Sequence, residues 1–361
     1  MRVVVVGASG NVGTSLLRSL ADEPAVESIL GIARRVPTQS FPKTEWRQAD
    51  IAHSSLRPLF QGVDAVVHLA WLIQPGRDKQ QLHQVNVEGS ARVFRAAAAA
   101  RVPALVYASS IGAYAPGPKD RAVDESWPTT GIASSFYARH KAEVERLLDR
   151  FEGDHPDTRV VRLRPGLIFK REAASGIRRL FAGPFLPSFL VQPRLIPVVP
   201  AHERLIFQAV HSYDIGDAYR RAVVNDEARG AFNIAADPVL DPDELARVLG
   251  ARKVPVPSGL LRGGAALTYR LRLQPSEPGW VDMAFAVPVM DTTRARTELG
   301  WEPRRTSSQA LLDLLEGIRD GAGLDTPPLE PGGAGPLRSR EFASGVGART
   351  DAPGANSPAE R

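Results

Sequence analysis

A serine, a tyrosine and a lysine in the first half of the chain have the types and spacing needed for acid–base chemistry. Ser110 follows the apolar run ALVYASS, and Tyr137 and Lys141 lie four residues apart in SSFYARHKAEVERLLDRF. Four residues are about one turn of a helix, so the phenol and the ammonium would project from one face. A surface pair without function is the alternative, and the position of the pair downstream of the serine argues against it.

A second stretch, RVVVVGASGNVG at the N-terminus, has the pattern of a dinucleotide-binding turn. Val3–Val6 are four β-branched residues in a row, typical of a short strand buried on both faces of a parallel sheet. Gly7, Gly10 and Gly13 follow at intervals of three residues, before the helical pattern TSLLRSL. The helix would direct free N–H groups at the turn, and the glycines would leave room for a diphosphate. The alternative is a glycine-rich turn that holds no ligand.

With a dinucleotide beside them, the three polar residues suit hydride transfer. A free tyrosine has a pKa of about 10, which is too high for a base at neutral pH. A neighbouring ammonium and an oxidised nicotinamide would both favour the phenolate and lower the pKa of Tyr137. The Ser110 hydroxyl could hold a substrate oxygen against the phenol while a hydride moves. The trio therefore predicts the interconversion of a carbonyl and a secondary alcohol.

The residues after the second predicted strand bear on the choice of cofactor. ESILGIARR ends near Ala33, and Arg34 and Arg35 follow where dinucleotide folds usually carry an acidic residue for the ribose 2′-hydroxyl. A basic residue there accommodates a 2′-phosphate. We therefore expect NADP(H) to be favoured over NAD(H), the alternative being two solvated surface arginines. A third strand, WRQAD, brings Asp50 to the adenine edge.

Strands and helices alternate along this half of the chain, which predicts a parallel sheet with right-handed crossovers. VDAVVHLAW from Val63 is a fourth buried strand, and the helix NVEGSARVFRAAAAARV after it is opened by Asn86. His68, at the end of the fourth strand, is interpreted as a hydrogen-bonded structural residue. Ser109 and Ser110 follow the fifth strand at its carboxyl end, the edge where ligands bind in open α/β sheets.

The composition limits the class of protein. With 361 residues, 43% of them hydrophobic and 24% charged, the chain can hold one large or two modest globular domains. The net charge is only +5 and the basic residues are scattered, so no nucleic-acid partner is expected. There is no cysteine, which excludes disulfides and thiolate catalysis, and no metal is expected. The N-terminus enters its strand at once, so a cytoplasmic location is expected.

The motifs resemble those of a known family. GASGNVG, Asp50, HLAW, the Asn86-Val87 pair, SSIGAY and YARHK are similar to those of the extended short-chain dehydrogenases/reductases, the NAD-dependent epimerase/dehydratase family. RLRPGLIF, AVHSYDIGDA and TTRARTELGWEP continue the resemblance to about residue 318. It implies an α/β fold, with a Rossmann-type doubly wound parallel sheet and a smaller C-terminal substrate domain. It also implies an NAD(P)-dependent enzyme.

The resemblance assigns roles to individual residues. Tyr137 would be the catalytic acid/base, Lys141 would lower its pKa and hold the ribose, and Ser110 would orient the substrate oxygen. Asn86 would support the active-site backbone and its water. The cofactor-binding residues that the resemblance implies are Gly7, Ser9, Gly10, Asn11, Val12, Gly13, Arg34, Arg35, Asp50, Ile51, Leu69, Ala70, Tyr137, Lys141 and Pro165. A homodimer through the helix bearing Tyr137 is also implied.

Two departures from the family pattern bear on the reaction. Family dehydratases carry an Asp-Glu pair directly after the active-site hydroxyl residue, whereas Ile111 and Gly112 stand here, so dehydration is not expected. Nucleotide-sugar epimerases often place an arginine on the diphosphate at a position that here holds Phe207, with Arg204 nearby. The leading hypothesis is therefore an oxidoreductase acting on a carbonyl or secondary alcohol. The alternatives are a (nucleotide-)sugar epimerase and a non-catalytic dinucleotide-sensing protein.

The remaining segments are assigned from their composition. Residues 1–165 are predicted to form the NAD(P)-binding domain, with its sheet completed by 204–236, and 166–203 and 237–320 the substrate domain. The stretch 166–203 is rich in Pro, Phe and Leu, which suggests an apolar and partly mobile insert that binds a small-molecule, apolar substrate. Ordinary packing of the smaller domain onto the sheet is the alternative. The prolines of this stretch argue against a membrane span. Residues 321–361, rich in Pro, Gly, Ala and Ser, are expected to be disordered.

Overall fold

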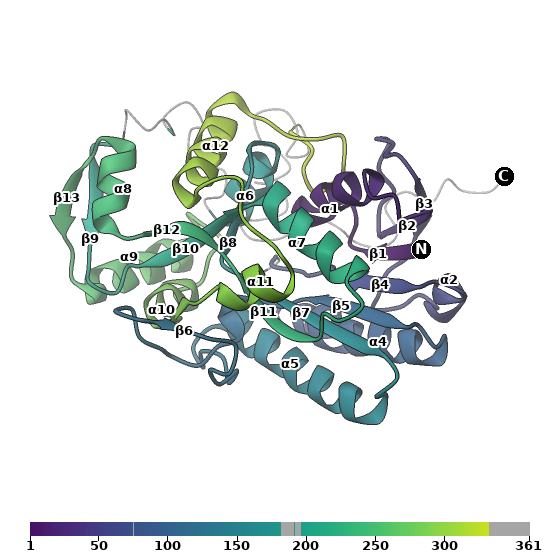
Figure 1. Ribbon diagram of the computed structural model, residues 1–361. Helices are drawn as coiled ribbons and strands as arrows, with labels where there is room; N and C mark the ends of the chain where they lie inside the picture. The colour runs from purple at the N-terminus through teal and green to yellow at the C-terminus, as the bar shows by residue number, and fades with distance from the viewer. Residues whose placement is uncertain (75, 182–190, 192–195, 332–361) are drawn as a thin grey trace.

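The structure, a computed structural model, describes residues 1–74, 76–181, 191 and 196–331 (Figure 1). Within these residues seven parallel strands form one sheet in the order β11-β7-β5-β4-β1-β2-β3. The strands are β1 (Arg2–Val6), β2 (Ser28–Ala33), β3 (Thr44–Gln48), β4 (Ala65–His68), β5 (Ala104–Ala108), β7 (Arg159–Pro165) and β11 (Gly230–Ile234). The chain runs outward from β1 to β3 and then returns to the other side of β1 as β4. The predicted doubly wound Rossmann-type sheet is therefore confirmed.

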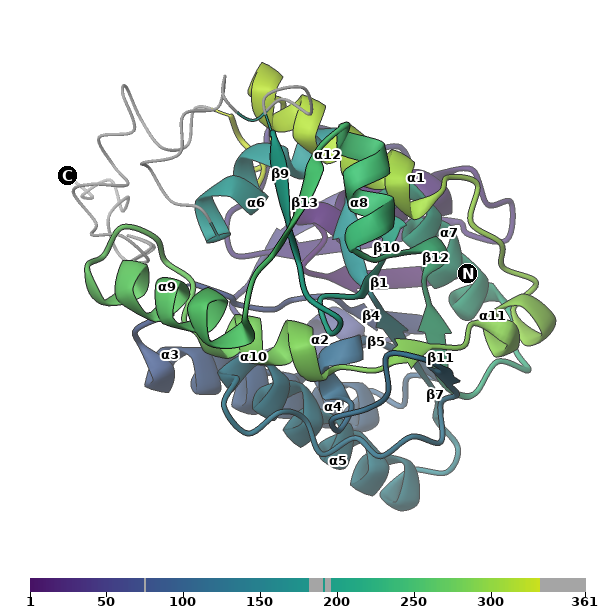
Figure 2. The same ribbon diagram turned by 90° about the vertical axis from the view of Figure 1, so that its left-hand side faces the viewer.

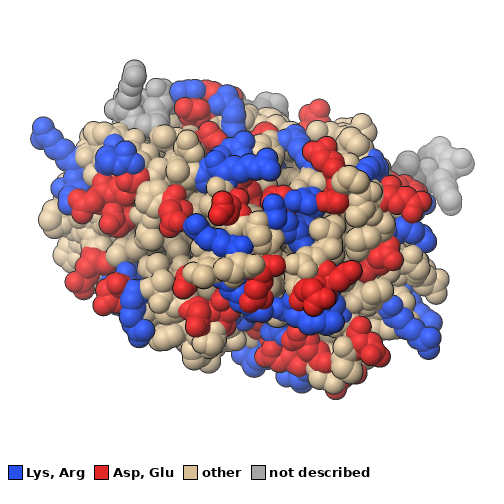
Figure 3. All heavy atoms as spheres, viewed as in Figure 1, with Lys and Arg blue, Asp and Glu red and all other residues tan. Residues whose placement is uncertain are grey.

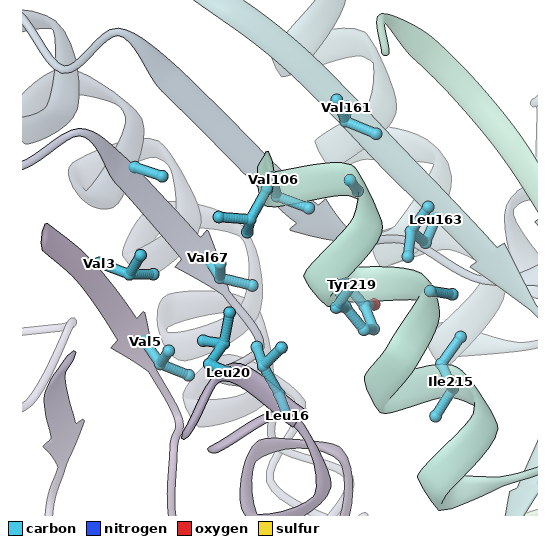
Figure 4. Close-up of a cluster of buried hydrophobic side chains, with 14 of the residues drawn as sticks. Val3, Val5, Leu16, Leu20, Val67, Val106, Val161, Leu163, Ile215 and Tyr219 are labelled. Atoms are coloured by element: carbon cyan, nitrogen blue, oxygen red, sulfur yellow. The ribbon is translucent and has the colours of Figure 1, made fainter. Parts of the chain in front are cut away.

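The first strand is buried on both faces because it is central in the sheet. Val3–Val6 pair with β2 on one side and β4 on the other, and each is at most 1% exposed. Val3 and Val5 join a core with α1 (Asn11–Ala21) and α7 (Ser212–Val224), part of which Figure 4 shows. Val4 and Val6 join a second core with α4 (Gly89–Ala99) and α5 (Phe136–Asp154). Figure 1 shows these helix pairs on opposite faces of the sheet.

The smaller part of the molecule is built from shorter strands and the later helices (Figure 2). Its three-stranded sheet has the order β12-β10-β8, and two-stranded pairs are formed by β13 with β9 and by β14 with β6. These strands are β6 (Ala122–Val123), β8 (Leu167–Phe169), β9 (Val198–Ala201), β10 (Phe207–His211), β12 (Ala236–Leu240), β13 (Arg252–Pro255) and β14 (Val289–Met290). The helices are α6 (Ala174–Phe181), α8 (Pro242–Leu249), α9 (Ser258–Arg270), α10 (Gly279–Ala286), α11 (Thr293–Glu298) and α12 (Ser307–Asp320). The short helix α2 (Arg57–Phe60) packs on the large sheet instead.

The stretch 204–236 is divided between the two sheets. β10 pairs in parallel with β8 of the small sheet, whereas β11 pairs in parallel with β7 at the edge of the large one. Between them, α7 packs on α1 so closely that a Cβ at Gly216 would lie 2.8 Å from the Ser15 carbonyl oxygen. The Ser15 and Ser212 hydroxyls are hydrogen-bonded at 2.8 Å across this contact. α7 and β11 thus complete the part of the fold that is built on the large sheet.

The helix before β5 begins earlier than the sequence suggested. The prediction that Asn86 opens it is wrong, because Asn86 lies in a π-helical turn, Gln84–Glu88, between α3 (Lys79–His83) and α4. Asp78 caps the start of α3, its side chain accepting a hydrogen bond from the Gln81 N–H at 2.9 Å. Asn86 is therefore an interior residue, and its amide is available to the neighbouring loop.

The chain beyond α12 is ordered as far as the structure describes it. Gly321 ends the helix with φ of +63°, and the Ala322 N–H bonds to the Gly317 carbonyl at 2.8 Å. Thr326 is fully buried and Leu329 is 3% exposed. The expectation of disorder is therefore wrong for residues 321–331. Residues 332–361 of that tail, like 182–190 and 192–195 of the apolar stretch, lie outside the described residues.

Charged side chains of both signs are interspersed over the face in Figure 3, with no large basic field there.

Among the described helices, none is both long and apolar enough to cross a membrane. No group of three or more His, Asp or Glu side chains that could hold a metal ion occurs in the described part of the chain.

Candidate active site

A cavity of about 300 Å³ lies at the carboxyl ends of β1 to β4. The predicted cofactor residues that line it are Gly7, Ser9, Gly10, Asn11, Val12, Gly13, Arg34, Arg35, Asp50, Ile51, Leu69 and Ala70. Three other predicted cofactor residues, Tyr137, Lys141 and Pro165, are not part of this lining. The cavity thus lies at the point where the strand order reverses, between β1 and β4, the usual ligand site of this kind of sheet.

The glycines of the turn have two different tasks. Gly7 has φ of +88°, and a Cβ there would lie 2.7 Å from the Ala70 nitrogen, while a Cβ at Gly13 would lie 2.5 Å from the Ala8 carbonyl oxygen. The packing of the protein itself therefore requires both. A Cβ at Gly10 would meet only the Gly7 carbonyl oxygen, at 3.4 Å. Gly10 is thus free of such packing demands, and its place on the cavity wall leaves space for a ligand.

The start of α1 suits an anionic ligand. Gly10 is its N-cap residue and provides no side-chain cap, so the first N–H groups of the helix have no side-chain acceptor. Asn11 donates its amide to the Ile168 carbonyl at 3.2 Å, and its buried Oδ1 has no hydrogen-bond partner among the described residues. N–H donors facing a cavity fit a diphosphate, and the amide oxygen could accept from a ribose hydroxyl. The residues present therefore fit a dinucleotide.

Ser110, Tyr137 and Lys141 come together beyond the end of β5. Ser135 caps α5 by accepting from the Ala138 N–H, which puts Tyr137 in the first helical turn and Lys141 one turn later. Gly112, whose N–H donates to the Ser110 hydroxyl at 3.0 Å, lies directly against the Tyr137 ring, so Ser110 and Tyr137 are neighbours. The Lys141 ammonium donates to the Ala108 carbonyl at 2.6 Å and lies 5.8 Å from the Tyr137 ring centroid.

Burial shifts the ionisation of both catalytic candidates on α5. It raises the pKa of Tyr137 to about 12, opposed by the Ser110 hydroxyl, and Lys141 contributes none of the lowering expected from the sequence. The phenol is therefore protonated at neutral pH. Burial also holds the pKa of Lys141 well below its usual range, opposed by the carboxylate of Glu145. Both groups are thus sensitive to any charge that enters the site.

Two tryptophans pack against the ring of Tyr137, and neither was predicted as a site residue from the sequence. The Trp71 ring is 5.9 Å from the Tyr137 ring and 3.6 Å from the Lys141 ammonium. Trp71 also lines the cavity, so it connects the cavity with the catalytic candidates. The Trp280 ring, from α10, is 5.0 Å from that of Tyr137 and 5.0 Å from that of Phe181. Residues this far apart in the chain give no spacing signal.

Asn86 and His68 are buried residues that stabilise the structure around the site. The Asn86 amide oxygen accepts from the Leu72 N–H at 2.7 Å, and its nitrogen donates to the Leu72 carbonyl at 2.8 Å. These bonds fix the backbone beside Trp71. His68 is fully buried, with its Nε2 hydrogen-bonded to the Ser90 hydroxyl at 2.9 Å. Burial and the charge of Lys141 lower the pKa of His68 to about 3, so the ring is neutral and structural, as expected.

A buried ionic cluster lies one helical turn behind Lys141. The Glu145 carboxylate is fully buried and accepts from Nε and Nη2 of Arg164 at 2.9 and 3.0 Å. It also accepts from Nη1 of Arg162 at 2.9 Å and from the Ser109 hydroxyl. Burial opposes its ionisation, but the hydrogen bonds and charges of the two arginines hold the pKa of Glu145 at about 2. The cluster therefore joins β7 to α5, the helix that carries Tyr137 and Lys141.

The two departures from the family pattern have structural counterparts. A Cβ at Gly112 would lie 2.9 Å from Cε1 of Tyr137, so a carboxylate side chain has no room there. Phe207 begins β10, and the nearby Arg204 donates to the Phe285 carbonyl at 2.9 Å and to the Gly117 carbonyl at 3.1 Å. Arg204 is thus engaged in joining segments of the smaller part of the molecule.

Residues far from every motif complete the cavity. They are Ala173, Gly176, Ile177 and Leu180 around α6, and Pro327, Pro328 and Leu329 after α12. The Pro- and Gly-rich composition after α12 predicts disorder, so nothing in that composition indicates that this segment lines a pocket.

The chain matches the model of the NAD dependent epimerase/dehydratase family over residues 3–235. An uncharacterized protein of Mycobacterium tuberculosis is 26% identical over 326 residues, which cover 90% of this chain and 31% of that protein. The chain therefore spans about a third of the length of this relative. A 4-hydroxy-2-methyl-3-oxo-4-farnesyl-3,4-dihydroquinoline-1-oxide ketoreductase of Stigmatella aurantiaca is 27% identical over 177 residues, 45% of this chain and 50% of that enzyme.

Among solved structures, the fold is similar to that of UDP-glucose-4-epimerase from Stenotrophomonas maltophila with bound NAD and formylated UDP-arabinopyranose. The TM-score is 0.67 at 20% sequence identity, with 89% of this chain and 98% of that one covered. At this identity the likeness concerns the fold.

Proposed function

This chain belongs to the NAD dependent epimerase/dehydratase family, a family of enzymes that use a nicotinamide dinucleotide, and from that premise we propose that it is an NAD(P)-dependent oxidoreductase. Its substrate is a carbonyl compound or the corresponding secondary alcohol. The observation that carries the proposal is the buried grouping of Ser110, Tyr137 and Lys141 beyond the end of β5. The dinucleotide, when bound along the glycine turn, supplies or accepts the hydride.

The protein's own residues manage the proton and the substrate oxygen. Ser110 holds the carbonyl oxygen beside the phenol, and Tyr137 donates its proton to that oxygen as negative charge develops there. Because burial raises the pKa of Tyr137 to about 12, the phenol carries this proton at neutral pH. The Lys141 ammonium stabilises the phenolate left behind and holds the ribose. Asn86 keeps the backbone at Leu72 in place.

The surroundings of Tyr137 favour an apolar substrate. Trp71 and Trp280 pack on its ring, and Arg204, which could serve a substrate diphosphate, is engaged by two backbone carbonyls. The ketoreductase of Stigmatella aurantiaca is named for a farnesylated quinoline oxide, a substrate of this apolar kind. We therefore infer a small apolar ketone as substrate. Nucleotide-sugar epimerisation is the competing function, since the Stenotrophomonas maltophila protein is named for it.

A substrate panel distinguishes these functions. We expect net oxidation of NADPH, followed by nicotinamide absorbance, with one or more apolar ketones and in equal amount to the alcohol formed. UDP-sugars incubated in parallel should emerge unchanged by chromatography. Epimerised sugar without net NADPH consumption would support the alternative. Tight dinucleotide binding with no turnover of either class would support the non-catalytic sensing protein.

We expect NADPH to bind more tightly than NADH. Arg34 and Arg35 line the cavity directly after β2, where a 2′-phosphate would lie. A charge-assisted contact to the phosphate would give a preference of roughly tenfold to a hundredfold. Fluorescence titration of both dinucleotides measures it, and the double variant Arg34→Ala/Arg35→Ala should remove most of it. The exposed Arg150→Ala is the control. Equal or reversed dissociation constants would contradict the role of the two arginines.

We also propose that two copies of the chain form a homodimer through α5. Sedimentation velocity of the purified chain should then give the mass of a dimer.

A further inference from the structure

The chain after α12 forms one wall of the cofactor cavity. We call residues 322–331 the C-terminal strap; Pro327, Pro328 and Leu329 within it line the same cavity as the glycine turn. Thr326 is fully buried and Leu329 is 3% exposed. Figure 2 shows the chain beyond α12 beside α6. The strap is thus packed into the fold at the cavity.

Side chains of α6 fix the strap in this position. Arg179 donates to the Pro328 carbonyl at 2.9 Å, and the Ser175 hydroxyl donates to the Ala322 carbonyl at 3.0 Å. The backbone at Gly176 approaches closely, since a Cβ there would lie 3.1 Å from the Pro328 carbonyl oxygen. These contacts hold the strap and α6 together as one surface.

The strap also has an ordered backbone of its own. The Leu329 N–H bonds to the Thr326 carbonyl at 2.8 Å, and the Leu324 N–H bonds to the Leu329 carbonyl at 3.2 Å. The resulting turn places Leu329 among the residues that line the cavity. A defined turn whose leucine is buried at a pocket wall differs from a chain end that merely lies on the surface.

The two kinds of cavity wall differ in chemistry. The glycine turn and the start of α1 provide N–H donors, which suit phosphate oxygens. The wall formed by α6 and the strap is apolar, with Ile177, Leu180 and Leu329 among its residues, and it suits the ring faces and ribose carbons of a dinucleotide. The strap lies outside residues 3–235, which the family model matches. The family match therefore says nothing about the strap.

We propose that the C-terminal strap is a binding element for the dinucleotide, which packs an apolar part of the cofactor against α6. This inference rests on the proposed dinucleotide binding and extends it to residues that no motif covers. The strap is tethered to α12, so the smaller part of the molecule contributes directly to cofactor affinity.

Dinucleotide affinity and hydrogen exchange test the proposal. Leu329→Ala should raise the dissociation constant for NADPH roughly fivefold, because it removes apolar contact with the ligand. The matched control is Leu267→Ala, on α9, where the leucine is 57% exposed. In the unmodified full chain, NADPH should slow amide exchange in a peptide covering 322–331 and leave a peptide covering 258–270 unchanged. If Leu329→Ala does not fold, the exchange experiment decides.

The outcomes separate this proposal from the proposed function. An unchanged dissociation constant for Leu329→Ala, or no protection of the strap in the full chain, overturns the role of the strap and leaves dinucleotide binding intact. A full chain that binds neither NADPH nor NADH overturns both.

Discussion

Replacing Tyr137 with phenylalanine is expected to lower kcat about a thousandfold, because the proton donor for the substrate oxygen is lost. The ring, which packs against Trp71 and Trp280, is retained. The dissociation constant for NADPH should therefore change by less than about threefold. Steady-state kinetics with the substrate found in the panel, together with NADPH titration, measure both quantities.

The control for this variant is Tyr219→Phe. Tyr219 is fully buried in α7, and its hydroxyl has no hydrogen-bond partner among the described residues. Its removal should leave kcat unchanged and test for a general effect of deleting a buried phenol. A Tyr137→Phe enzyme with the parent kcat would rule out the acid/base role. If that variant also kept its biological activity, a dinucleotide-sensing protein would be the better interpretation.

Glu145→Gln is expected to lower the free energy of unfolding by roughly 3–5 kcal/mol. The neutral amide would leave Arg164 buried without its carboxylate partner and would leave Arg162 paired with Asp149 and Glu152 alone. Urea denaturation followed by circular dichroism measures the loss. Asp149→Asn is the matched control, because Asp149 also accepts from Arg162 but is 61% exposed. That change should cost less than about 1 kcal/mol.

The effect of Glu145 should also depend on pH. Its folded-state pKa of about 2 lies below the value of about 4.3 for an unfolded glutamate. The stability that its carboxylate contributes is therefore fully present above about pH 4.3 and is lost as pH falls toward the folded-state value. The unfolding free energies of parent and Glu145→Gln should converge over this range. A difference that stays constant with pH would contradict the assigned ionisation.

The large sheet could be predicted because its signals are local. Val3–Val6 form an apolar run since both neighbouring strands bury them, and α5 and α12 show periodic patterns with capping residues. α9 (Ser258–Arg270) could not be predicted in this way, because none of its residues is buried. Its Leu260 and Leu267 are 68% and 57% exposed, so its apolar residues do not mark a buried face.

The candidate site likewise contains residues that could be predicted and residues that could not. The glycine turn could be predicted because it is one continuous stretch whose backbone forms the turn. Trp280 approaches Tyr137 only through the packing of α10, and no spacing in the chain reports such a contact. The strap was mistaken for a disordered tail because composition measures the average of a segment. One buried leucine and a few carbonyls bonded to α6 are enough to hold it.

The route of the chain between the two sheets limits how this protein can be rebuilt. Along the chain, β8 and β10 of the small sheet come between β7 and β11, which are neighbours in the large sheet. A gene fragment ending at Pro165 would encode a sheet without its edge strand and without the helix that covers the face beside α1. A chimaera that replaces the smaller part of the molecule must therefore exchange two separate segments, residues 166–211 and 236–331, and keep the stretch between them.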